Sequence, residues 1–389
     1  HIMVPASQRL RISLIENRPS PVALWPIYDS SRGQVLVPTT SIQRQLQANT
    51  LLTVSYVGTF GHHLILDAQN NPANPALCQS LSTAASVMPN TATCGPYGET
   101  GVFYPASGGA LTVRGPFNSI NPTTGGAIFG DNGYYLDAGN SDYHALQVSL
   151  RKTAGRLQIL LAYTYSKSMD NGSGFGDQVV LNGNSHQFEA LSVFDMPNNF
   201  SASYTYELPF DKLFHSNNRG IRGWKVSGIT TFTNGTPVQI VESDDNSLLG
   251  STSNSPQAGA TDEPNRLPSN IYVNRNPRKQ YLDPTTNTLV NPYFNPALFT
   301  KEALGQQGNA SRRFFLGPGL NNWNLALLKD VKLTEKLKLE FRGEFFNAFN
   351  HTQFVGGISG DIVPGPSSFG GAFSAQGARV GQVAAKFIF

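Results

Sequence analysis

The sequence predicts an all-β fold: an antiparallel up-and-down β-barrel that crosses a membrane, present as a partial barrel of about nine or ten strands with long loops on one rim. Three observations support this prediction: apolar and polar side chains alternate, short and long connections alternate, and charges are scarce. Charged residues make up only 14% of the 389 residues, where about a quarter is usual in soluble domains. The 38 Gly, 25 Pro, 14 Tyr and 24 Phe are typical of a chain with many turns and many rings.

Alternation with a period of two residues is the strongest local pattern. In the run "YHALQVSLRK", Leu146, Val148 and Leu150 share one face, while Gln147 and Ser149 lie on the other. Such alternation indicates a strand with one apolar and one polar face. The pattern recurs at 41–48, 51–60, 157–168, 199–210, 223–232, 322–331, 336–345 and 381–389.

The connections between these runs alternate in length. Short connections are expected at 47–50, 153–156 and 333–336, with a moderate link after Phe210. Long connections, which are uncommon in compact domains above about 15 residues, are expected at 61–142, 167–198, 234–321 and 347–379. Short turns on one rim and long loops on the other indicate an outer-membrane barrel whose short turns face the periplasm.

A soluble β-sandwich stays open as an alternative fold, in which the chain would be a binding module, because its strands alternate in the same way. The unequal loop lengths favour the barrel, since a sandwich gives no reason for them. No run approaches the roughly 18 apolar residues that a membrane helix needs. The 28 basic and 25 acidic residues are well mixed along the chain, so nucleic acid is not expected as a partner.

The two cysteines, Cys78 and Cys94, lie in a segment rich in Pro, Asn, Ser and Thr, without the spacing of a zinc site. A disulfide that closes one surface loop is the favoured interpretation over two free thiols. It would imply an oxidising compartment.

No motif predicts a catalytic residue, a metal or a cofactor. The segments "NGSGFGD" (171–177) and "GGISGD" (356–361) only approximate a nucleophile elbow and do not follow a buried parallel strand, as the elbow requires. His62 and His63 are adjacent, and neighbours in a strand point to opposite faces, so they are not expected to share an ion with Asp67. If the chain is an enzyme, the alternative is a hydrolase, esterase-like or lactonase-like, of the kind recovered from environmental DNA.

Several blocks carry a resemblance to a known family: "SDYHALQVSLRK", "FDMPNNFSASYTYELPF", "GWKVSGITTFTNGTPVQI", "FFLGPGLNNWNLALLKDVKLTEKLKLEFRGEFFNAFNHTQF" and the final "KFIF". Together they resemble the C-terminal part of TonB-dependent receptor-like outer-membrane proteins. The group is the Oar-like one of Acidobacteria, whose N-terminus carries a carboxypeptidase-regulatory-like domain. The resemblance covers about Ser41 to Phe389. It implies an outer-membrane location, and a parent protein that binds and imports a bulky nutrient such as an oligosaccharide, a peptide or a chelated metal.

The resemblance also implies a division of the chain. Residues 1–40 are expected to be an irregular N-terminal segment, with residues foreign to the natural protein at its start and one strand near 9–16. Residues 41–389 are expected to be the C-terminal portion of an outer-membrane β-barrel. The plug and the TonB box of such receptors have no counterpart in this sequence.

Two sets of residues receive roles from the resemblance. Leu337, Leu339, Phe341 and Phe345 would face lipid, while Phe346, Phe349 and His351 would lie at the outer rim, where Asn347, Asn350 and Gln353 begin the next loop. In the last strand, Gln382, Phe387 and Phe389 resemble the signal that the barrel-assembly machinery reads, with Ala384 where that signal usually has Gly.

Candidate ligand contacts are chosen by composition alone, as rings in the long connections. They are Tyr134, Tyr135, Phe175, Tyr293 and Phe294. The sequence does not identify the nutrient.

Overall fold

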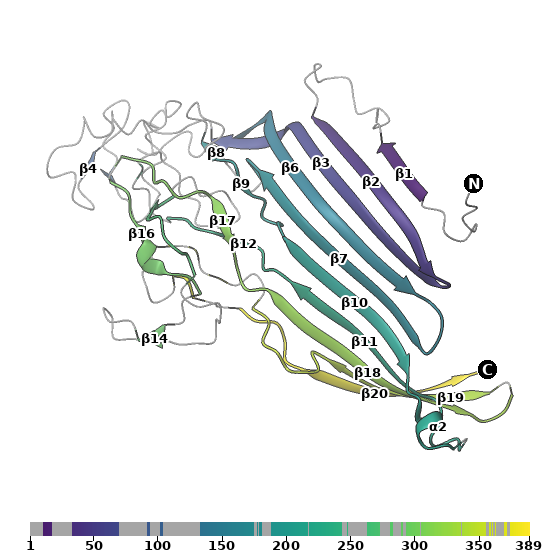
Figure 1. Cartoon of the computed structure of the whole chain (residues 1–389). Helices are drawn as coiled ribbons and strands as arrows, with labels where there is room; N and C mark the ends of the chain where they lie inside the picture. Colours follow the sequence, from purple (N-terminus) through teal and green to yellow (C-terminus); the bar gives the residue numbers. More distant parts are fainter. Residues whose placement is uncertain are drawn as a thin grey trace, which may run out of the picture.

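A single antiparallel sheet forms the body of the protein in the computed structural model (Figure 1). Strands that follow one another along this path in the chain are also neighbours in the sheet, which is an up-and-down meander. The main path consists of β1 (Arg11–Asn17), β2 (Gln34–Gln47), β3 (Thr50–Gln69), β6 (Gly133–Lys152), β7 (Leu157–Asp170), β10 (Asn198–Glu207), β11 (Trp224–Thr233), β18 (Leu320–Lys332), β19 (Lys338–Phe346) and β20 (Val380–Ile388).

The structure describes residues 11–17, 33–69, 92–93, 102–103, 133–174, 177, 179–180, 188–216, 218–242, 247, 263–272, 281–282, 289–290, 293–303, 305–335, 337–354, 358, 360, 362, 369–371 and 374–389. The prediction of nine strands, or ten with one near 9–16, is confirmed, because β1 lies there and pairs with β2. β2 begins at Gln34, some residues before the expected start of the barrel at residue 41. Among the described residues, no helix is long and apolar enough to cross a membrane.

The register of the strands joins apolar residues into one continuous face. Directly opposed residues of an antiparallel pair lie on the same face, and one row runs through Val148, Tyr163, Phe200 and Phe232. The neighbouring row is polar, with Gln147, Thr164, Asn199 and Thr233. The alternation expected from the sequence is therefore confirmed across several strands.

None of the described residues forms a second layer over the apolar face. Leu146 is 44% exposed, Phe341 47% and Phe345 52%, and the small sheets of the described residues lie among the loops, outside the main sheet. A soluble protein rarely leaves so wide an apolar surface in water. A β-sandwich would cover this face with another sheet, so the sandwich alternative is wrong, and the face is suited to lipid.

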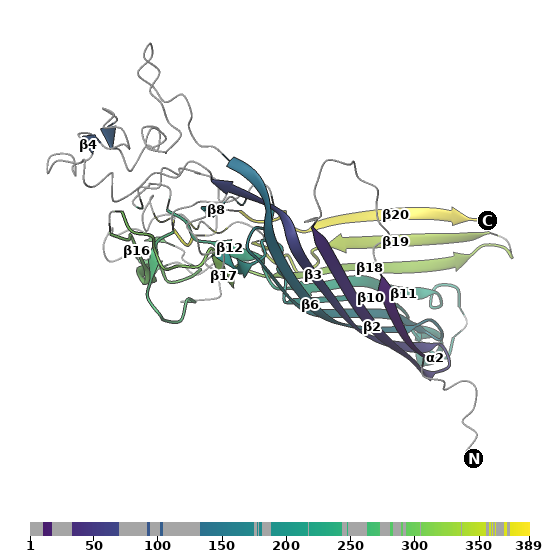
Figure 2. The ribbon, with the colours of Figure 1, turned by 90° about the horizontal axis from the view of Figure 1, so that it is seen from above.

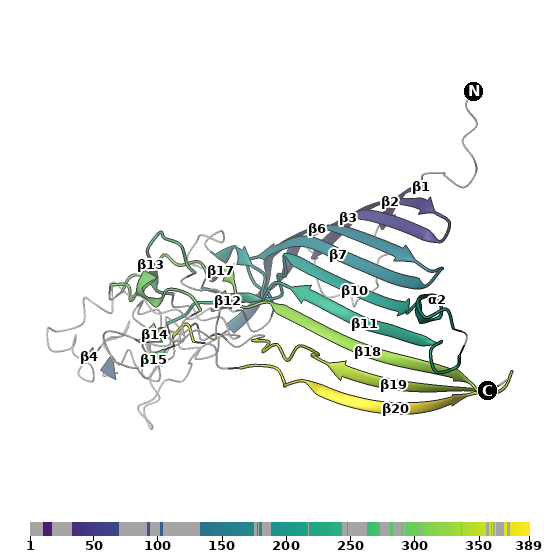
Figure 3. The same cartoon turned by 60° about the horizontal axis from the view of Figure 1, so that its bottom comes forward.

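Short and long connections separate to opposite ends of the sheet (Figure 3). The turns after β2, β6 and β18 are short, and a moderate link with the one-turn helix α2 (Phe210–Leu213) joins β10 to β11. The long connections gather at the other end. Their predicted limits are corrected at two places: β3 and β6 continue as strands to Gln69 and from Gly133, and β7 continues to Asp170.

These extensions carry the strands beyond the membrane. A membrane-spanning strand needs about 9–11 residues, whereas β3 and β6 have 20 residues each. Their outer ends bury Leu66 and Ala68 against Phe188 of the connection between β7 and β10. The sequence did not reveal this extension, because a β-bulge around His63, with φ of 55°, breaks the alternation of β3.

A chain of ring contacts marks the rim at the long loops. Phe200 stacks on Phe232 at 6.0 Å between centroids, and Trp323 meets Phe232 and Phe349 edge-to-face, at 5.6 Å in each case. Amphipathic and aromatic side chains gather at the membrane interface. The row therefore indicates where the outer leaflet ends.

The segment "EFFNAFNHTQF" turns the chain at this rim, as expected. Asn347 and Asn350 have positive φ values of 49° and 52°, which Asn tolerates better than most residues. The backbone N–H of His351 donates to the Asn347 side chain at 2.9 Å. Gln353, 3% exposed, pairs with the backbone of Asn321 at the start of β18. The rings beside these amides are an interface belt.

The sheet is curved but open, and β1 and β20 are its two edges within the described residues (Figure 2). Unpaired backbone groups at a sheet edge are costly in lipid, where no water can satisfy them. In lipid, these two edges therefore need hydrogen-bonding partners.

The assignment of faces predicts opposite effects at two adjacent residues of β7. Leu161 lies on the apolar face, opposite Leu150 and Ala202, and Ala162 lies on the polar face, opposite Ser149 and Ser201. We expect Leu161→Arg to lower the free energy of unfolding by about 2–4 kcal/mol, because a charge in mid-membrane loses its hydration. Reversible urea unfolding in lipid vesicles measures this effect.

Ala162→Arg is the matched control, with the same added side chain one residue away. Ala162→Arg should lower the free energy of unfolding by less than about 1 kcal/mol, because the polar face offers water and polar neighbours. Equal losses for both variants would contradict the assignment of faces.

Candidate functional site at the loop rim

The long connections 234–319 and 347–379 fold together into a unit that we call the loop head. Its small sheets pair β12 (Pro237–Gln239) with β17 (Arg313–Leu316), β13 (Asn265–Arg266) with β16 (Phe299–Thr300), and β14 (Tyr281–Leu282) with β15 (Leu289–Val290). Its buried core consists of Val238, Ile240, Ile271, Phe294, Leu298, Phe299, Phe315 and Phe369. The head is thus a packed body on top of the sheet.

Phe294 lies at the centre of this core. Its side chain is 0% exposed and meets Phe299, Phe315 and Phe369 edge-to-face, at 5.7, 5.2 and 5.0 Å between centroids. Tyr293 is 5% exposed and packs edge-to-face on Tyr272 at 5.7 Å. These two candidate ligand contacts therefore hold the head together in this structure, and their contact with a ligand stays a prediction.

A buried ionic cluster joins the loop head to the end of β7. Arg312 donates to Asp170 at 2.8 Å and also to Asp177. Arg313 donates to Asp177 at 2.6 Å, to the Ser173 hydroxyl at 2.8 Å and to the carbonyl of Leu191 at 2.8 Å. All four charged side chains are nearly inaccessible to water.

The cluster gives the polar segment 169–177 a structural role. Asp170 and Asp177 are only 4% and 5% exposed. Their partners, Arg312 and Arg313, lie more than a hundred residues away in the chain. Composition alone does not show which arginines pair with these aspartates. Two adjacent arginines in a chain with so few charges were nevertheless a sign of an ionic cluster.

Hydrogen bonds fix the rest of the connection between β7 and β10 to the same place. The backbone N–H of Ser168 donates to Asp195 at 2.7 Å, and the hydroxyls of Ser168 and Ser192 lie 2.8 Å apart. β9 (Ala190–Leu191) pairs with the end of β7. Two long connections, 171–197 and 234–319, thus meet at one anchored base.

The pKa values of two carboxyls at this base shift in opposite directions. Burial favours the neutral form of Asp177, but the hydrogen bond from Arg313 and the charge of Arg312 outweigh burial and lower its pKa. Burial raises the pKa of Glu263 to about 8, with Arg312 opposing the rise and Asp177 adding to it. Near neutral pH Glu263 is therefore largely protonated, whereas Asp177 is ionised.

The polar face of the last strands carries a continuous chain of alternating charges. Asp330 contacts Lys225 at 2.8 Å and Lys338 at 2.7 Å, and Arg342 contacts Glu340 at 3.3 Å and Glu344 at 3.1 Å. Gln382 of β20 continues the chain by donating to Glu344. Since the opposite face is suited to lipid, this wall faces the interior of the barrel, where a polar solute would meet it.

Exposed apolar side chains near the loop rim provide the available contact surface. Tyr135 is 63% exposed on β6, and Ile65 of the paired strand β3 is 62% exposed. Phe194, at 62%, follows β9 in the connection between β7 and β10. Of the candidate ligand contacts, Tyr135 is the exposed one among those whose side chains the structure describes.

The other predicted site residues fall in three places. Tyr134 lies in β6 and only its backbone is described, and Phe175, Cys78 and Cys94 lie outside the described residues. Phe387 and Phe389 lie on the apolar face and at the end of the chain, 58% and 95% exposed. Recognition of these two rings by the barrel-assembly machinery stays a prediction, as does the role of Gln382.

The histidines of β3 and β6 have neutral partners. Nδ1 of His62 lies 3.1 Å from the Asn140 side chain, and Nδ1 of His144 lies 2.8 Å from the Tyr56 hydroxyl. Nδ1 of His63 lies 3.3 Å from the carbonyl of Asp137. A hydrolytic triad instead needs a histidine oriented by a carboxylate.

A family model described as an outer membrane beta barrel domain matches residues 30–382 of the chain. The match covers eight of the ten strands of the path, β2 to β19, together with the start of β20 and the loop head. No curated protein matches the chain.

The solved structures that are similar to the chain include three outer-membrane proteins of low sequence identity. The outer-membrane transporter YddB of Escherichia coli is 10% identical, with a TM-score of 0.40 over 93% of this chain and 33% of that one. The ferric-catecholate import receptor Fiu of E. coli is 10% identical (TM-score 0.39; 97% and 32% covered). The siderophore receptor PirA of Acinetobacter baumannii is 9% identical (TM-score 0.39; 92% and 32% covered). The chain spans about a third of the length of each.

The ionic cluster predicts that the head loosens when one counter-ion is removed. Asp177→Asn leaves two buried guanidinium groups with Asp170 alone, and breaking a buried pair costs about 3–5 kcal/mol. We expect faster cleavage of the loops by proteinase K, with the strands still protected. Glu335→Gln, an equal change at an exposed residue of the opposite rim, should leave cleavage unchanged. Unchanged cleavage of the Asp177 variant would contradict the anchoring role.

The raised pKa of Glu263 predicts a head that weakens as pH rises. Its folded pKa of about 8 lies above the ordinary 4.5, so the folded head binds the proton more tightly than the unfolded one. The contribution of Glu263 to the stability of the folded head is fully present below about pH 4.5 and is lost as pH rises through about 8. The urea concentration that opens the head to protease should fall over this range, and less so in Glu263→Gln. Parallel curves for both proteins would contradict this assignment.

Proposed function

The chain belongs to the outer-membrane β-barrel domain family, and on that premise we propose that it is the C-terminal barrel portion of a TonB-dependent receptor-like transporter whose loop head binds a bulky nutrient. The outer-membrane location follows from the family, and the lipid-suited face of the sheet agrees with it. Contact with outer-membrane lipid follows in turn.

The observation that carries this proposal is the loop head itself. Long connections on one rim of a membrane-spanning sheet fold around their own aromatic core and are fixed by buried ion pairs. Ordering so much loop costs conformational entropy. A channel wall alone does not require that ordering, whereas recognition of a ligand at the cell surface does.

The chemistry near the rim suits a large, polar ligand. Tyr135, Ile65 and Phe194 expose apolar surface, on which the apolar faces of sugars or of peptide side chains can pack. Below them, the alternating charges from Lys225 to Gln382 give the inner wall a hydrophilic surface. An oligosaccharide, a peptide or a chelated metal fits this arrangement.

The partial character of the barrel is also part of the proposal. The edges β1 and β20 need partner strands in lipid, and a parent with more strands would supply them. The assignment to the Oar-like group of Acidobacteria rests on the sequence blocks described above. Recognition of Gln382, Phe387 and Phe389 by the barrel-assembly machinery is proposed on the same resemblance.

The partners of His62, His63 and His144 are an amide, a carbonyl and a phenol. A report of hydrolytic activity would therefore need a single Ser, His or Asp substitution that abolishes it.

The proposal predicts that one exposed ring at the loop rim contributes to ligand binding. Tyr135→Ser should weaken binding of the best ligand from a panel of oligosaccharides, peptides and ferric chelates, because truncating an aromatic contact typically costs about 1–2 kcal/mol, or roughly 5- to 30-fold in Kd. Calorimetric titration of the detergent-solubilised chain measures this.

Tyr206→Ser is the matched control, since Tyr206 is 38% exposed near the short-turn end of β10. It should bind as the unsubstituted chain does. If no member of the panel binds, or if Tyr135→Ser and Tyr206→Ser bind equally well, the exposed surface at the loop rim is not the ligand site.

A further inference from the structure

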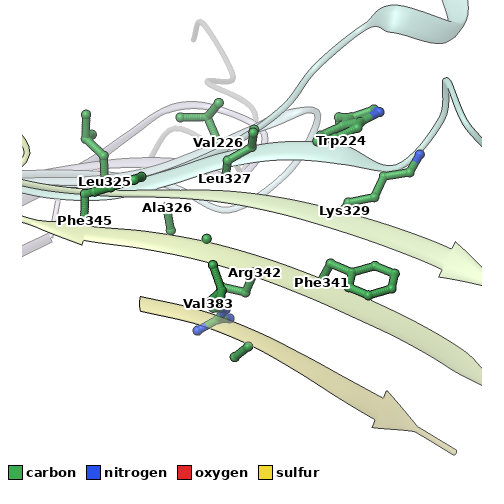
Figure 4. Close-up of a pocket in the computed structure, with 12 residues that line it drawn as sticks. Trp224, Val226, Leu325, Ala326, Leu327, Lys329, Phe341, Arg342, Phe345 and Val383 are labelled. Atoms are coloured by element: carbon green, nitrogen blue, oxygen red, sulfur yellow. The ribbon is translucent and has the colours of Figure 1, made fainter. Parts of the chain in front are cut away.

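A groove of about 560 Å³ lies on the lipid-suited face, over β18, β19 and β20 (Figure 4). Its floor is Gly343, where an added Cβ would meet no atom within 4 Å. Leu325 and Phe345 lie toward the loop end of the groove, and Trp224 and Lys329 lie toward the short-turn end. The groove therefore runs along the strands and ends in a cationic group.

The link 208–223 between β10 and β11, which we call the periplasmic link, lies beside the mouth of this groove. It contains α2 and exposes Leu213 at 66% and Phe214 at 60%. Exposed apolar groups next to basic ones are typical of segments that lie in the membrane interface. The link thus continues the lipid-suited face toward the periplasm.

Lys329 holds the link in place. Its Nζ donates to the carbonyls of Arg219 at 2.8 Å, Gly220 at 2.9 Å and Arg222, and it lies 5.1 Å from the centre of the Trp224 ring. Trp224 Nε1 donates to the carbonyl of Gly220 at 3.0 Å. The donors of Lys329 are thus used within the protein, while the backbone of Arg219 and Arg222 is fixed at the mouth.

The charge around the mouth is positive. The one acidic residue of the link, Asp211, is held by both guanidinium nitrogens of Arg156, at 3.1 and 3.0 Å. Arg219 and Arg222 are exposed. The guanidinium group of an arginine can donate two parallel hydrogen bonds to one phosphate. An anion at this place would lie where lipid headgroups lie.

We propose that the groove and the periplasmic link together bind one anionic phospholipid of the periplasmic leaflet. One acyl chain lies along Gly343, and the phosphate faces Arg219 and Arg222. The site is continuous with the lipid-suited face, and its positive mouth selects an anionic headgroup over a zwitterionic one. The proposal is independent of the nutrient and of the loop head.

Trp224 reports on this site, because it lines the groove. In a background with Trp25→Phe and Trp323→Phe, only Trp224 remains to fluoresce. The full chain is placed in dodecyl maltoside micelles that contain a minor fraction of phosphatidylglycerol or phosphatidylcholine with brominated acyl chains. Bromine quenches a nearby indole, so quenching measures occupancy of the groove.

We expect half-maximal quenching at an amount of brominated phosphatidylglycerol on the order of tenfold lower than of brominated phosphatidylcholine. Arg219→Gln with Arg222→Gln should abolish that preference. Gly343→Leu should lower quenching by both lipids, because its side chain fills the groove. Arg151→Gln with Lys152→Gln, an equal charge change on the same rim at β6, should keep the preference.

Equal quenching by the two lipids, or an unchanged preference in Arg219→Gln with Arg222→Gln, would overturn the proposal. Equal loss of the preference for phosphatidylglycerol in the Arg151→Gln with Lys152→Gln control would also overturn the proposal. The preference would then depend only on the total charge of this rim. Unaltered quenching in Gly343→Leu would show that the lipid does not occupy the groove. If a variant fails to fold, the salt dependence of the unsubstituted chain decides, because an exposed anion site must lose its preference at high ionic strength.

Discussion

The rest of the structure depends on one constraint: in lipid, every backbone N–H and C=O must find its partner within the protein. The ten-stranded meander meets this constraint everywhere except at β1 and β20. Because each strand pairs with its neighbours in a fixed register, its side chains are divided between an apolar and a polar face. The lipid-suited surface, the charged inner wall and the ring contacts at the rim all follow from this division.

The long loops lie beyond the lipid-facing strands, so this constraint does not apply to them. Other interactions must order them. The loop head uses a core of rings around Phe294 and a buried cluster of two arginines and two aspartates. A buried ion pair adds little stability compared with an apolar contact, but losing one partner is costly. The cluster is therefore suited to fixing how the connections meet, while the aromatic core supplies the favourable burial.

The two rims differ in chemistry as well as in length. At the loop rim, rings and amides end the strands and a packed body stands above them. At the opposite rim, Lys329 gathers three carbonyls and leaves the arginines of the link facing outward. The proposed nutrient site and the proposed lipid site thus lie at opposite ends of one sheet, and each uses side chains that the meander itself does not need.

The sequence by itself determined the strands, their alternation and the separation of short from long connections, because a period of two residues and the chemistry of turns are local properties. It also placed the segment from Glu344 to Phe354 at the rim. Only the tertiary structure decided what the long loops do. Phe294 and Tyr293 are candidate ligand contacts by composition but lie buried in the loop head, and Asp177 binds two arginines more than a hundred residues away. Such contacts depend on which distant segments meet, and no local pattern encodes that.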